Sequence, residues 1–424
     1  MLQRVLVGGL GAAMLLAAGL SPASAAQSEQ IDFYRQNFGA PGVLFEGTAL
    51  DATGALTLAS SGLQSGAYTD PYSGAVIPYR SGKWTSPWHP ISFAFSELVA
   101  SWNAITPTGT WLQVEMQASI NKGSQTKWYT MGIWAADTST IHPTSVGGQG
   151  DADGSVAIDT FLAKDHPMTS YRLAVTLFRR DTSSVTPSQR LLGAVASNAP
   201  NVNLKPTAPS PAGGAEGVVL DVPGLSQEVH AGEYPEFDGG GEAWCSPSST
   251  EMIVEYWKRG PTPGQLASLP PSTDPNARTP TQDLQVDYAA MHTYDYHYQG
   301  TGNWPFNMAY AASFGLEAEV MQLHSLTEAE QFIKAGIPLA ASLAFSGNQL
   351  GGFLLKSTDG HLLVISGFTQ TGDVLANDPA AVNDAEVRKV YSRQEFERAW
   401  LGATGGIVYV IHPTDVPLPP LSTP

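Results

Sequence analysis

Cysteine is nearly absent from this sequence, because Cys245 is the only cysteine among 424 residues. A chain with one cysteine cannot form an internal disulfide. An unpaired thiol in an oxidising compartment is open to oxidation, so it is either buried as a small apolar group or kept for its chemistry. Cys245 is therefore the first candidate functional residue.

Charge is also scarce, and basic charge is scarcest. Charged residues make up 14% of the chain, and 38 acidic residues against 21 basic ones give a net charge of −17. Such a chain lacks the basic surface by which proteins bind nucleic acid or anionic lipid. It also lacks a His-Glu-x-x-His motif and any clustered cysteine and histidine spacing. We therefore expect no nucleic-acid partner, no metal and no cofactor.

Long apolar runs are missing after the first 25 residues. Residues 1–25 combine a basic start, an apolar stretch from Val5 to Leu20 and the small residues Ala23-Ser24-Ala25. This pattern is typical of a secretory signal peptide. The apolar stretch is short for a membrane span, and no later run approaches the required length. We expect cleavage after Ala25 and a secreted, extracellular protein without a transmembrane segment; a retained N-terminal anchor is the alternative.

Helical periodicity is scarce in residues 26–204. Short alternating segments recur instead, bounded by Gly, Pro, Asp, Asn or Ser, as at 55–58, 110–116, 128–134 and 171–178. The pattern predicts an all-β sandwich or jelly-roll domain of unknown role. Its tryptophans offer a possible platform for a cell-wall or polysaccharide contact, although packing in the core is the commoner role of such side chains.

The composition divides the remainder of the chain into three parts. Residues 205–217 are rich in Pro, Gly, Ala and Ser and predict a linker with little to bury. Residues 218–413 form the second expected domain, since 424 residues exceed one typical core. Residues 414–424 predict a disordered proline-rich tail.

Helical segments precede most strands in residues 218–413, which indicates an α+β domain. The first helix is expected from Cys245 to about Lys258, with Ser246 as N-cap and Pro247 at the first helical position. Further helices are expected at 304–314 and 327–336 and one opening at 392, and strands at 338–344, 361–368, 373–377 and 407–411.

A thiol nucleophile needs a base and usually a third group that orients the base. The candidate bases in the second domain are its histidines, which are His230, His292, His297, His324, His361 and His412. His361 differs from the others because it follows an Asp-Gly turn and opens an apolar strand. A short loop joins that strand to the next, which ends at Asn377-Asp378-Pro379. Either Asn377 or Asp378 is therefore expected beside His361.

These residues resemble papain-like cysteine peptidases, and specifically the bacteriocin-processing (double-glycine leader) peptidase family and its stand-alone exported relatives. The resemblance lies in Trp-Cys-Ser-Pro-Ser-Ser at 244–249 and in Val-Pro followed by Gln227 at 222–227. It covers residues 218–413 and implies a papain-like fold there. It further implies Cys245 as nucleophile, His361 as base, Asp378 as orienter and Gln227 as a side chain of the oxyanion hole.

The resemblance implies a cysteine peptidase that hydrolyses a peptide or protein substrate through a Cys245 thioester. The family's membrane transporter and its GxxxxGK[ST] phosphate loop have no counterpart here, so leader cleavage during export is not carried over. The alternatives are an acyltransferase or amidase on the same fold, and a non-catalytic cell-surface binding protein. We interpret Gly239–Gly241 as slack that lets Gln227 and Cys245 approach each other.

Overall fold

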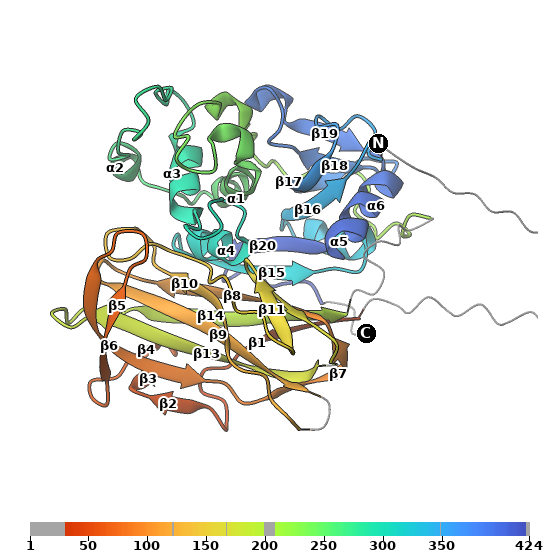
Figure 1. Ribbon diagram of the computed structural model, residues 1–424. Helices are drawn as coiled ribbons and strands as arrows, with labels where there is room; N and C mark the ends of the chain where they lie inside the picture. The colour runs from red at the N-terminus through yellow and green to blue at the C-terminus, as the bar shows by residue number, and fades with distance from the viewer. Residues whose placement is uncertain (1–29, 121–122, 167, 199–207, 348, 421–424) are drawn as a thin grey trace, which may run out of the picture.

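The computed structural model describes residues 30–120, 123–166, 168–198, 208–347 and 349–420, which form two domains (Figure 1). The expected signal peptide at 1–25 lies outside the described residues. Strands make up nearly all of the regular structure up to residue 198, and a mixture of helices and strands follows. The expected order of an all-β part before an α+β part is confirmed.

The N-terminal domain consists of two antiparallel sheets that share one core. Within the described residues each sheet has seven strands; one runs β11-β12-β8-β14-β4-β3 with β1 beside β14, and the other runs β10-β9-β13-β6-β2 with β5 and β7 attached. Alternate residues of β13, such as Leu173, Val175 and Leu177, point into this core together with Trp84 and Trp102. The strands are β1 (Gln30–Arg35), β2 (Leu44–Glu46), β3 (Thr48–Leu50), β4 (Leu56–Leu58), β5 (Gln64–Thr69), β6 (Val76–Thr85), β7 (His89–Phe95), β8 (Glu97–Ile105), β9 (Thr110–Ile120), β10 (Tyr129–Trp134), β11 (Gly154–Ala157), β12 (Thr160–Ala163), β13 (Met168–Arg180) and β14 (Ser188–Asn198).

The C-terminal domain is built on one antiparallel sheet with the order β15-β20-β16-β17-β18-β19. Helices α1, α3 and α4 contribute to the apolar cluster on one side of the sheet, and α5 and α6 contribute to a second cluster on the other side. The elements are η1 (Glu228–His230), η2 (Gly241–Ala243), α1 (Cys245–Tyr256), α2 (Pro263–Leu266), α3 (Leu284–Thr293), α4 (Trp304–Ala312), β15 (Leu316–Gln322), α5 (Leu326–Lys334), β16 (Leu339–Phe345), β17 (Thr358–Phe368), β18 (Val374–Asn377), η3 (Asp384–Glu386), β19 (Arg388–Tyr391), α6 (Arg393–Thr404) and β20 (Ile407–Pro413).

The predicted helix starts need two corrections. Ser246 is not the N-cap of α1, because Trp244 holds that position and the Ser246 hydroxyl lies 2.8 Å from the Tyr409 hydroxyl inside the core. Helix α5 begins at Leu326 rather than Thr327, since Ser325 is the residue whose side chain accepts from the Glu328 N–H. In both helices the first turn begins one or two residues before the position that the local pattern indicates.

The segments expected to be a loose linker and a disordered tail make specific contacts where the structure describes them. The Glu330 carboxylate accepts from the backbone N–H groups of Gly213 and Ala215 at 2.8 Å each, and Ala215 is fully buried. In the tail, Val416 and Leu418 pack against the core that contains α5 and α6. The expectations of little burial at 205–217 and of disorder throughout 414–424 are therefore wrong for residues 208–217 and 414–420.

The two domains meet along the edge strand β15. The Asn103 side chain of β8 bonds both backbone groups of Ala318, donating to its carbonyl at 2.7 Å and accepting from its N–H at 3.1 Å. The Arg35 guanidinium donates to Glu319 at 2.9 Å. Phe306 and Tyr310 of α4 belong to the core of the sandwich. The sheet edge is thus covered rather than open, and the domains share buried apolar surface.

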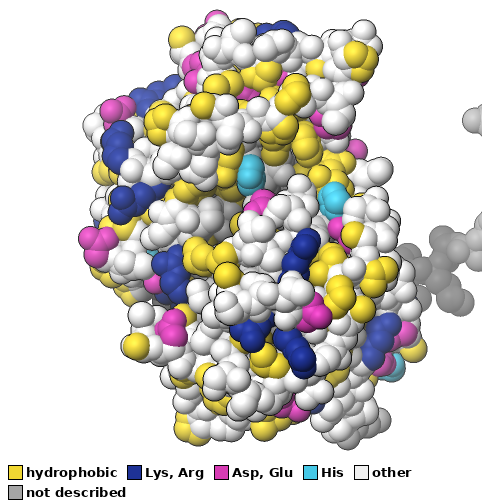
Figure 2. Space-filling model, turned by 90° about the vertical axis from the view of Figure 1, so that its left-hand side faces the viewer, with side chains coloured by type: hydrophobic (Ala, Val, Ile, Leu, Met, Phe, Trp, Pro, Cys, Tyr) yellow, Lys and Arg dark blue, Asp and Glu magenta, His cyan; other side chains and the backbone are white. Residues whose placement is uncertain are grey.

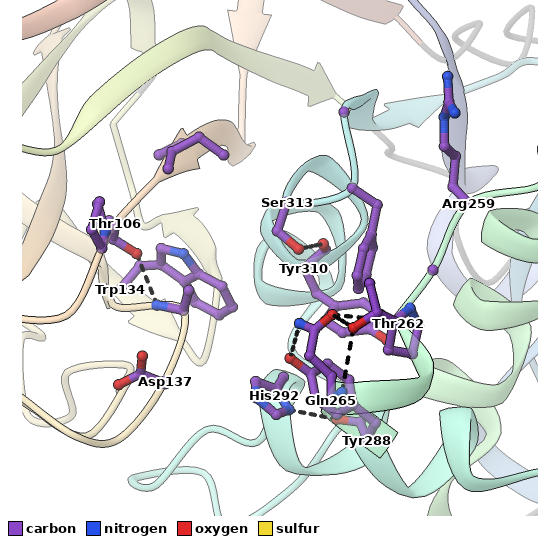
Figure 3. Close-up of a pocket in the computed structure, with 18 of the residues that line it drawn as sticks. Thr106, Trp134, Asp137, Arg259, Thr262, Gln265, Tyr288, His292, Tyr310 and Ser313 are labelled. Atoms are coloured by element: carbon purple, nitrogen blue, oxygen red, sulfur yellow. Dashed lines mark hydrogen bonds between the residues drawn. The ribbon is translucent and has the colours of Figure 1, made fainter. Parts of the chain in front are cut away.

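A cleft of about 1020 Å³ also lies between the domains. Thr106, Trp134 and Asp137 of the sandwich form one wall, and side chains of α3, α4 and the segment after α1 form the other (Figure 3). The space-filling view shows the surface hollowed on this side, with apolar and histidine side chains around the hollow (Figure 2). Lys258 and Arg259, which follow the C-terminal end of α1, line the cleft. The cleft therefore lies at the opposite end of α1 from Cys245. In the part of the chain that the structure describes, no helix is long and apolar enough to cross a membrane.

Candidate active site

Cys245 is the first residue of α1 and is half-buried. Its neighbour Trp244 anchors the start of the helix, because the buried indole N–H donates to the Phe237 carbonyl at 2.8 Å and the Trp244 carbonyl accepts from Ser248 N–H at 3.0 Å. The backbone N–H groups of a first helical turn have no partner within the helix, and the helix dipole adds positive potential there. The thiol therefore stands where a negative charge is stabilised.

His361 lies in β17, buried beside Cys245, with 2% of its surface exposed. Its Nε2 is 2.8 Å from Asp378 Oδ1, and Phe353 packs edge-on against the ring with 5.4 Å between centroids. Burial acts to lower the pKa of His361, but the Asp378 charge and hydrogen bond, with a further hydrogen bond to Cys245, outweigh it and raise the pKa to about 10. Because Nε2 faces Asp378, the thiol is left with the Nδ1 side of the ring.

Asp378 follows β18 and is fully buried. Besides His361, its carboxylate accepts from the Tyr391 hydroxyl at 2.7 Å and from the Ala380 N–H at 3.0 Å. Burial acts to raise the pKa of Asp378, yet the His361 charge and these hydrogen bonds keep it below its ordinary value. The carboxylate is therefore ionised at neutral pH and fixed in direction.

The structure distinguishes between the two neighbouring candidates for the partner of His361. The Asn377 amide points away from the imidazole and donates to the Val222 and Pro223 carbonyls at 3.0 Å each. Asn377 thus holds the segment that leads to Gln227, whereas Asp378 contacts His361. Tyr391 lies in strand β19, which the sequence did not predict. Its hydroxyl donates to the Asp378 carboxylate, and no motif in the sequence identifies Tyr391 as part of the site.

Gln227 is buried, with 3% of its surface exposed, and lies against the loop that precedes Cys245. Its amide Nε2 donates to the Glu242 carbonyl at 2.6 Å and is 3.3 Å from Glu228 Oε1. Its backbone N–H donates to the Pro379 carbonyl at 2.9 Å, next to Asp378. Gln227 therefore connects the loop carrying the thiol to the turn carrying the carboxylate.

The glycines before Cys245 are not slack, which corrects our interpretation. A Cβ at Gly241 would lie 2.4 Å from the carbonyl carbon of His230 and 2.6 Å from the carbonyl oxygen of Gln227. Gly240 adopts a φ of 109°, which side chains with a Cβ rarely tolerate. The glycines let two backbone segments pack in contact, so they fix the position of the loop.

The remaining histidines of this domain have other surroundings. His230 is buried against Glu233 and Asp287, and its ring lies 6.0 Å from that of Trp244. His292 stacks on Tyr288 beside the interdomain cleft, and His324 contacts Glu328. His412 bonds the Pro413 carbonyl. Among the described histidines of the domain, His361 is the one that combines contact with Cys245 and with a carboxylate.

A half-buried thiol at a helix start, a protonated imidazole and an ionised carboxylate contact one another in that order here. Such an arrangement can supply a nucleophile, a proton donor for a leaving group and an orienting charge. It lies at the N-terminal end of α1, and the interdomain cleft contains none of these residues. The chemistry available is therefore acyl transfer at the start of α1.

Comparison with known proteins gives two family matches. Residues 219–407 match the model described as "Peptidase_C39 like family", and residues 40–197 match "Peptidase C39 N-terminal domain". Among curated proteins, none matches this chain. Solved structures of infectious bursal disease virus, Gt and Gx strains, match at 12% and 14% identity with TM-scores of 0.18, over 43% of this chain and 36% of theirs. This chain thus spans about a third of those viral chains, and the likeness supports no argument about fold or function.

Proposed function

We propose that this chain, whose two parts match peptidase C39 family models, is a secreted cysteine peptidase acting on peptide bonds. The observation that supports this most directly is the contact of His361 with both Cys245 and Asp378, with 2.8 Å between His361 Nε2 and Asp378 Oδ1. The proposed nucleophile, base and orienter come from α1, β17 and the turn after β18. Secretion is proposed from residues 1–25 alone.

In the proposed mechanism, Cys245 and His361 rest as a thiolate and an imidazolium. The raised pKa of His361, about 10, keeps its proton at neutral pH, and Asp378 balances that charge. The thiolate attacks the carbonyl carbon of a peptide bond, and a C–S bond forms. As the C–N bond breaks, His361 donates its proton to the departing amine, which leaves a thioester on Cys245. Water then adds to the thioester, His361 takes one of its protons, and the carboxylic acid is released.

The developing oxyanion needs hydrogen-bond donors that are already in place. We assign this role to the Cys245 backbone N–H and the Gln227 amide, whose Nε2 already contacts the carbonyl of Glu242 close to the thiol. The two amide protons meet the Glu242 carbonyl at 2.6 Å and Glu228 Oε1 at 3.3 Å, and the longer contact with Glu228 is the one that a substrate oxyanion would replace. Removing one such donor in comparable sites lowers the rate about 10²–10³-fold.

The test is turnover by the full chain with Cys245→Ala as the decisive variant. Cleavage of a peptide library is measured by mass spectrometry. We expect Cys245→Ala to abolish this cleavage and to leave the circular dichroism spectrum unchanged. Ser248→Ala is the matched control, because Ser248 lies one turn along the same helix and its hydroxyl has no partner among the described residues. It should cleave at the rate of the unmodified protein.

The same assay separates the alternatives. Products that gain an added amine acceptor instead of water would assign an acyltransferase. A separate measurement is the rate at which iodoacetamide labels Cys245. If this rate does not exceed that of a free thiol, and if no library member is cleaved, the site is not catalytic. Cleavage that survives in Cys245→Ala would contradict the proposal.

A further inference from the structure

Three buried side chains converge beneath the loop that carries Cys245. His230 Nδ1 is 2.8 Å from Glu233 Oε2 and 3.4 Å from Asp287 Oδ2. One potential ligand atom from each residue lies within 4.8 Å of the others, and none of the three residues is more than 1% exposed. His230 belongs to η1 and Asp287 to α3, so the cluster joins segments that are distant in the sequence.

The hydrogen bonds within the described residues do not account for this cluster. Both carboxylate oxygens of Asp287 are buried without a donor, and His230 Nε2 is buried without a partner. The one N–H at Nδ1 is shared between two carboxylates, with the shorter contact to Glu233 at 2.8 Å and the longer to Asp287 at 3.4 Å. Glu233 differs, because its Oε1 is paired with Arg278 at 2.9 Å, which leaves Oε2 turned toward His230. Buried polar atoms without partners commonly mark a missing water or ion.

We propose that His230 Nδ1, Glu233 Oε2 and the Asp287 carboxylate bind a divalent transition-metal ion. One imidazole nitrogen and two carboxylates, without a thiolate, form a donor set suited to Zn²⁺ or Mn²⁺. Ligand atoms bonded at about 2.0–2.2 Å to one ion lie about 3–3.5 Å apart. The distance of 3.4 Å from His230 Nδ1 to Asp287 has that spacing, and the 2.8 Å distance to Glu233 would lengthen by a few tenths of an ångström when an ion replaces the proton. The ion would give the Asp287 carboxylate a positive partner in addition to His230, whereas Glu233 already has Arg278.

The position of this site gives the ion a structural role. The backbone of His230 lies directly under Gly241, and the ring of His230 is 6.0 Å from the ring of Trp244. An ion here would connect η1, which follows Gln227, to α3. It would thereby stabilise the position of the loop that precedes Cys245. It would take no part in the chemistry, because Cys245, His361 and Asp378 lie outside the cluster. The proposal stands whether or not the chain is a peptidase.

The first measurement is the metal content of the purified full chain after growth with added zinc and manganese. We expect about one ion per chain in the unmodified protein. The same content in Cys245→Ala would show that the Cys245 thiol is not a ligand. Asp287→Asn, which keeps the volume but removes the charge, should hold less than a tenth of that amount. His297→Asn is the control, because His297 is exposed and lies outside the cluster; it should hold as much metal as the unmodified protein.

The second measurement needs no variant and covers the case in which Asp287→Asn does not fold. Prolonged dialysis of the unmodified protein against 1,10-phenanthroline should lower its melting temperature by about 5–10 °C, and added Zn²⁺ or Mn²⁺ should restore it. A metal-free protein whose melting temperature responds to neither ion would overturn the proposal. Full metal content in a folded Asp287→Asn variant would overturn it as well.

Discussion

Asp378→Asn is the substitution that separates a charge-based role of this residue from a merely structural one. Asparagine keeps the size of the side chain and can still bond His361, but it removes the negative charge. The charge and hydrogen bond of Asp378 are the largest effects that raise the pKa of His361 to about 10, from an ordinary value of 6.5. The variant should therefore lower the pKa of His361 while leaving the fold intact.

The size of the change follows from the contact. A carboxylate in direct contact with an imidazolium raises its pKa by about 1–3 units, which corresponds to about 1–4 kcal/mol for a pair shielded from water. The pKa of His361 in Asp378→Asn should then fall to about 7–9. The raised pKa contributes stability that is fully present below pH 6.5 and is lost as the pH rises through about 10. The variant should accordingly lose more stability at pH 6 than near pH 10.

The assay is the pH dependence of kcat/KM together with the rate of alkylation of Cys245 by iodoacetamide. In the unmodified protein the alkaline fall of kcat/KM should lie near pH 10, where His361 loses the proton that it gives to the leaving amine. In Asp378→Asn the fall should move down by about 1–3 pH units. Asn377→Ser is the matched control at the adjacent residue; it should lower stability by freeing the Val222–Pro223 segment and leave the alkaline fall in place. An alkaline fall at the same pH in Asp378→Asn and the unmodified protein would refute the assignment of Asp378.

Three further predictions concern the loop, the oxyanion donor and the domain interface. Gly241→Ala should lower the free energy of unfolding by about 1–3 kcal/mol and reduce activity, because its Cβ would overlap the His230 backbone, whereas Gly239→Ala, with open space around it, should lose only about 1 kcal/mol in urea titrations. Gln227→Ala should reduce kcat about 10²–10³-fold with KM little changed; a variant with unchanged kcat would remove Gln227 from the oxyanion hole. Asn103→Ala should cost about 1–3 kcal/mol, because it leaves backbone groups of Ala318 unpaired, and both domains should still unfold in one transition when followed by tryptophan fluorescence and circular dichroism. Two separate transitions would show that the shared core does not couple the domains.

The sequence predicted the parts of the fold that depend on local pattern. Four strands of the C-terminal sheet and helices α1, α4, α5 and α6 lie where periodicity and turn residues place them, within a few residues. Strand β15 was not predicted, although Leu316–Gln322 opens with alternating apolar and charged residues and follows the turn residue Gly315. It becomes a buried edge only through Asn103 and Arg35 of the other domain. Contacts of that kind join residues more than 200 positions apart and leave no local signal.

The choice between Asn377 and Asp378 shows where sequence reasoning reaches its limit. Adjacent residues of an extended segment project to opposite sides, so of Asn377, the last residue of β18, and Asp378, the residue after it, only one can meet His361. Which one does depends on the register of β17 against β18, where Asn377 pairs with Val364 and the ladder is irregular between Ile365 and Gly367. An irregularity of one residue exchanges the faces beyond it, so counting alternate residues from His361 cannot decide the matter. The hydrogen bonds decide it, because Asp378 receives the Tyr391 hydroxyl in addition to His361. The carboxylate is thus held by a strand that the sequence did not predict, and the orientation of His361 depends on tertiary contacts that no local motif encodes.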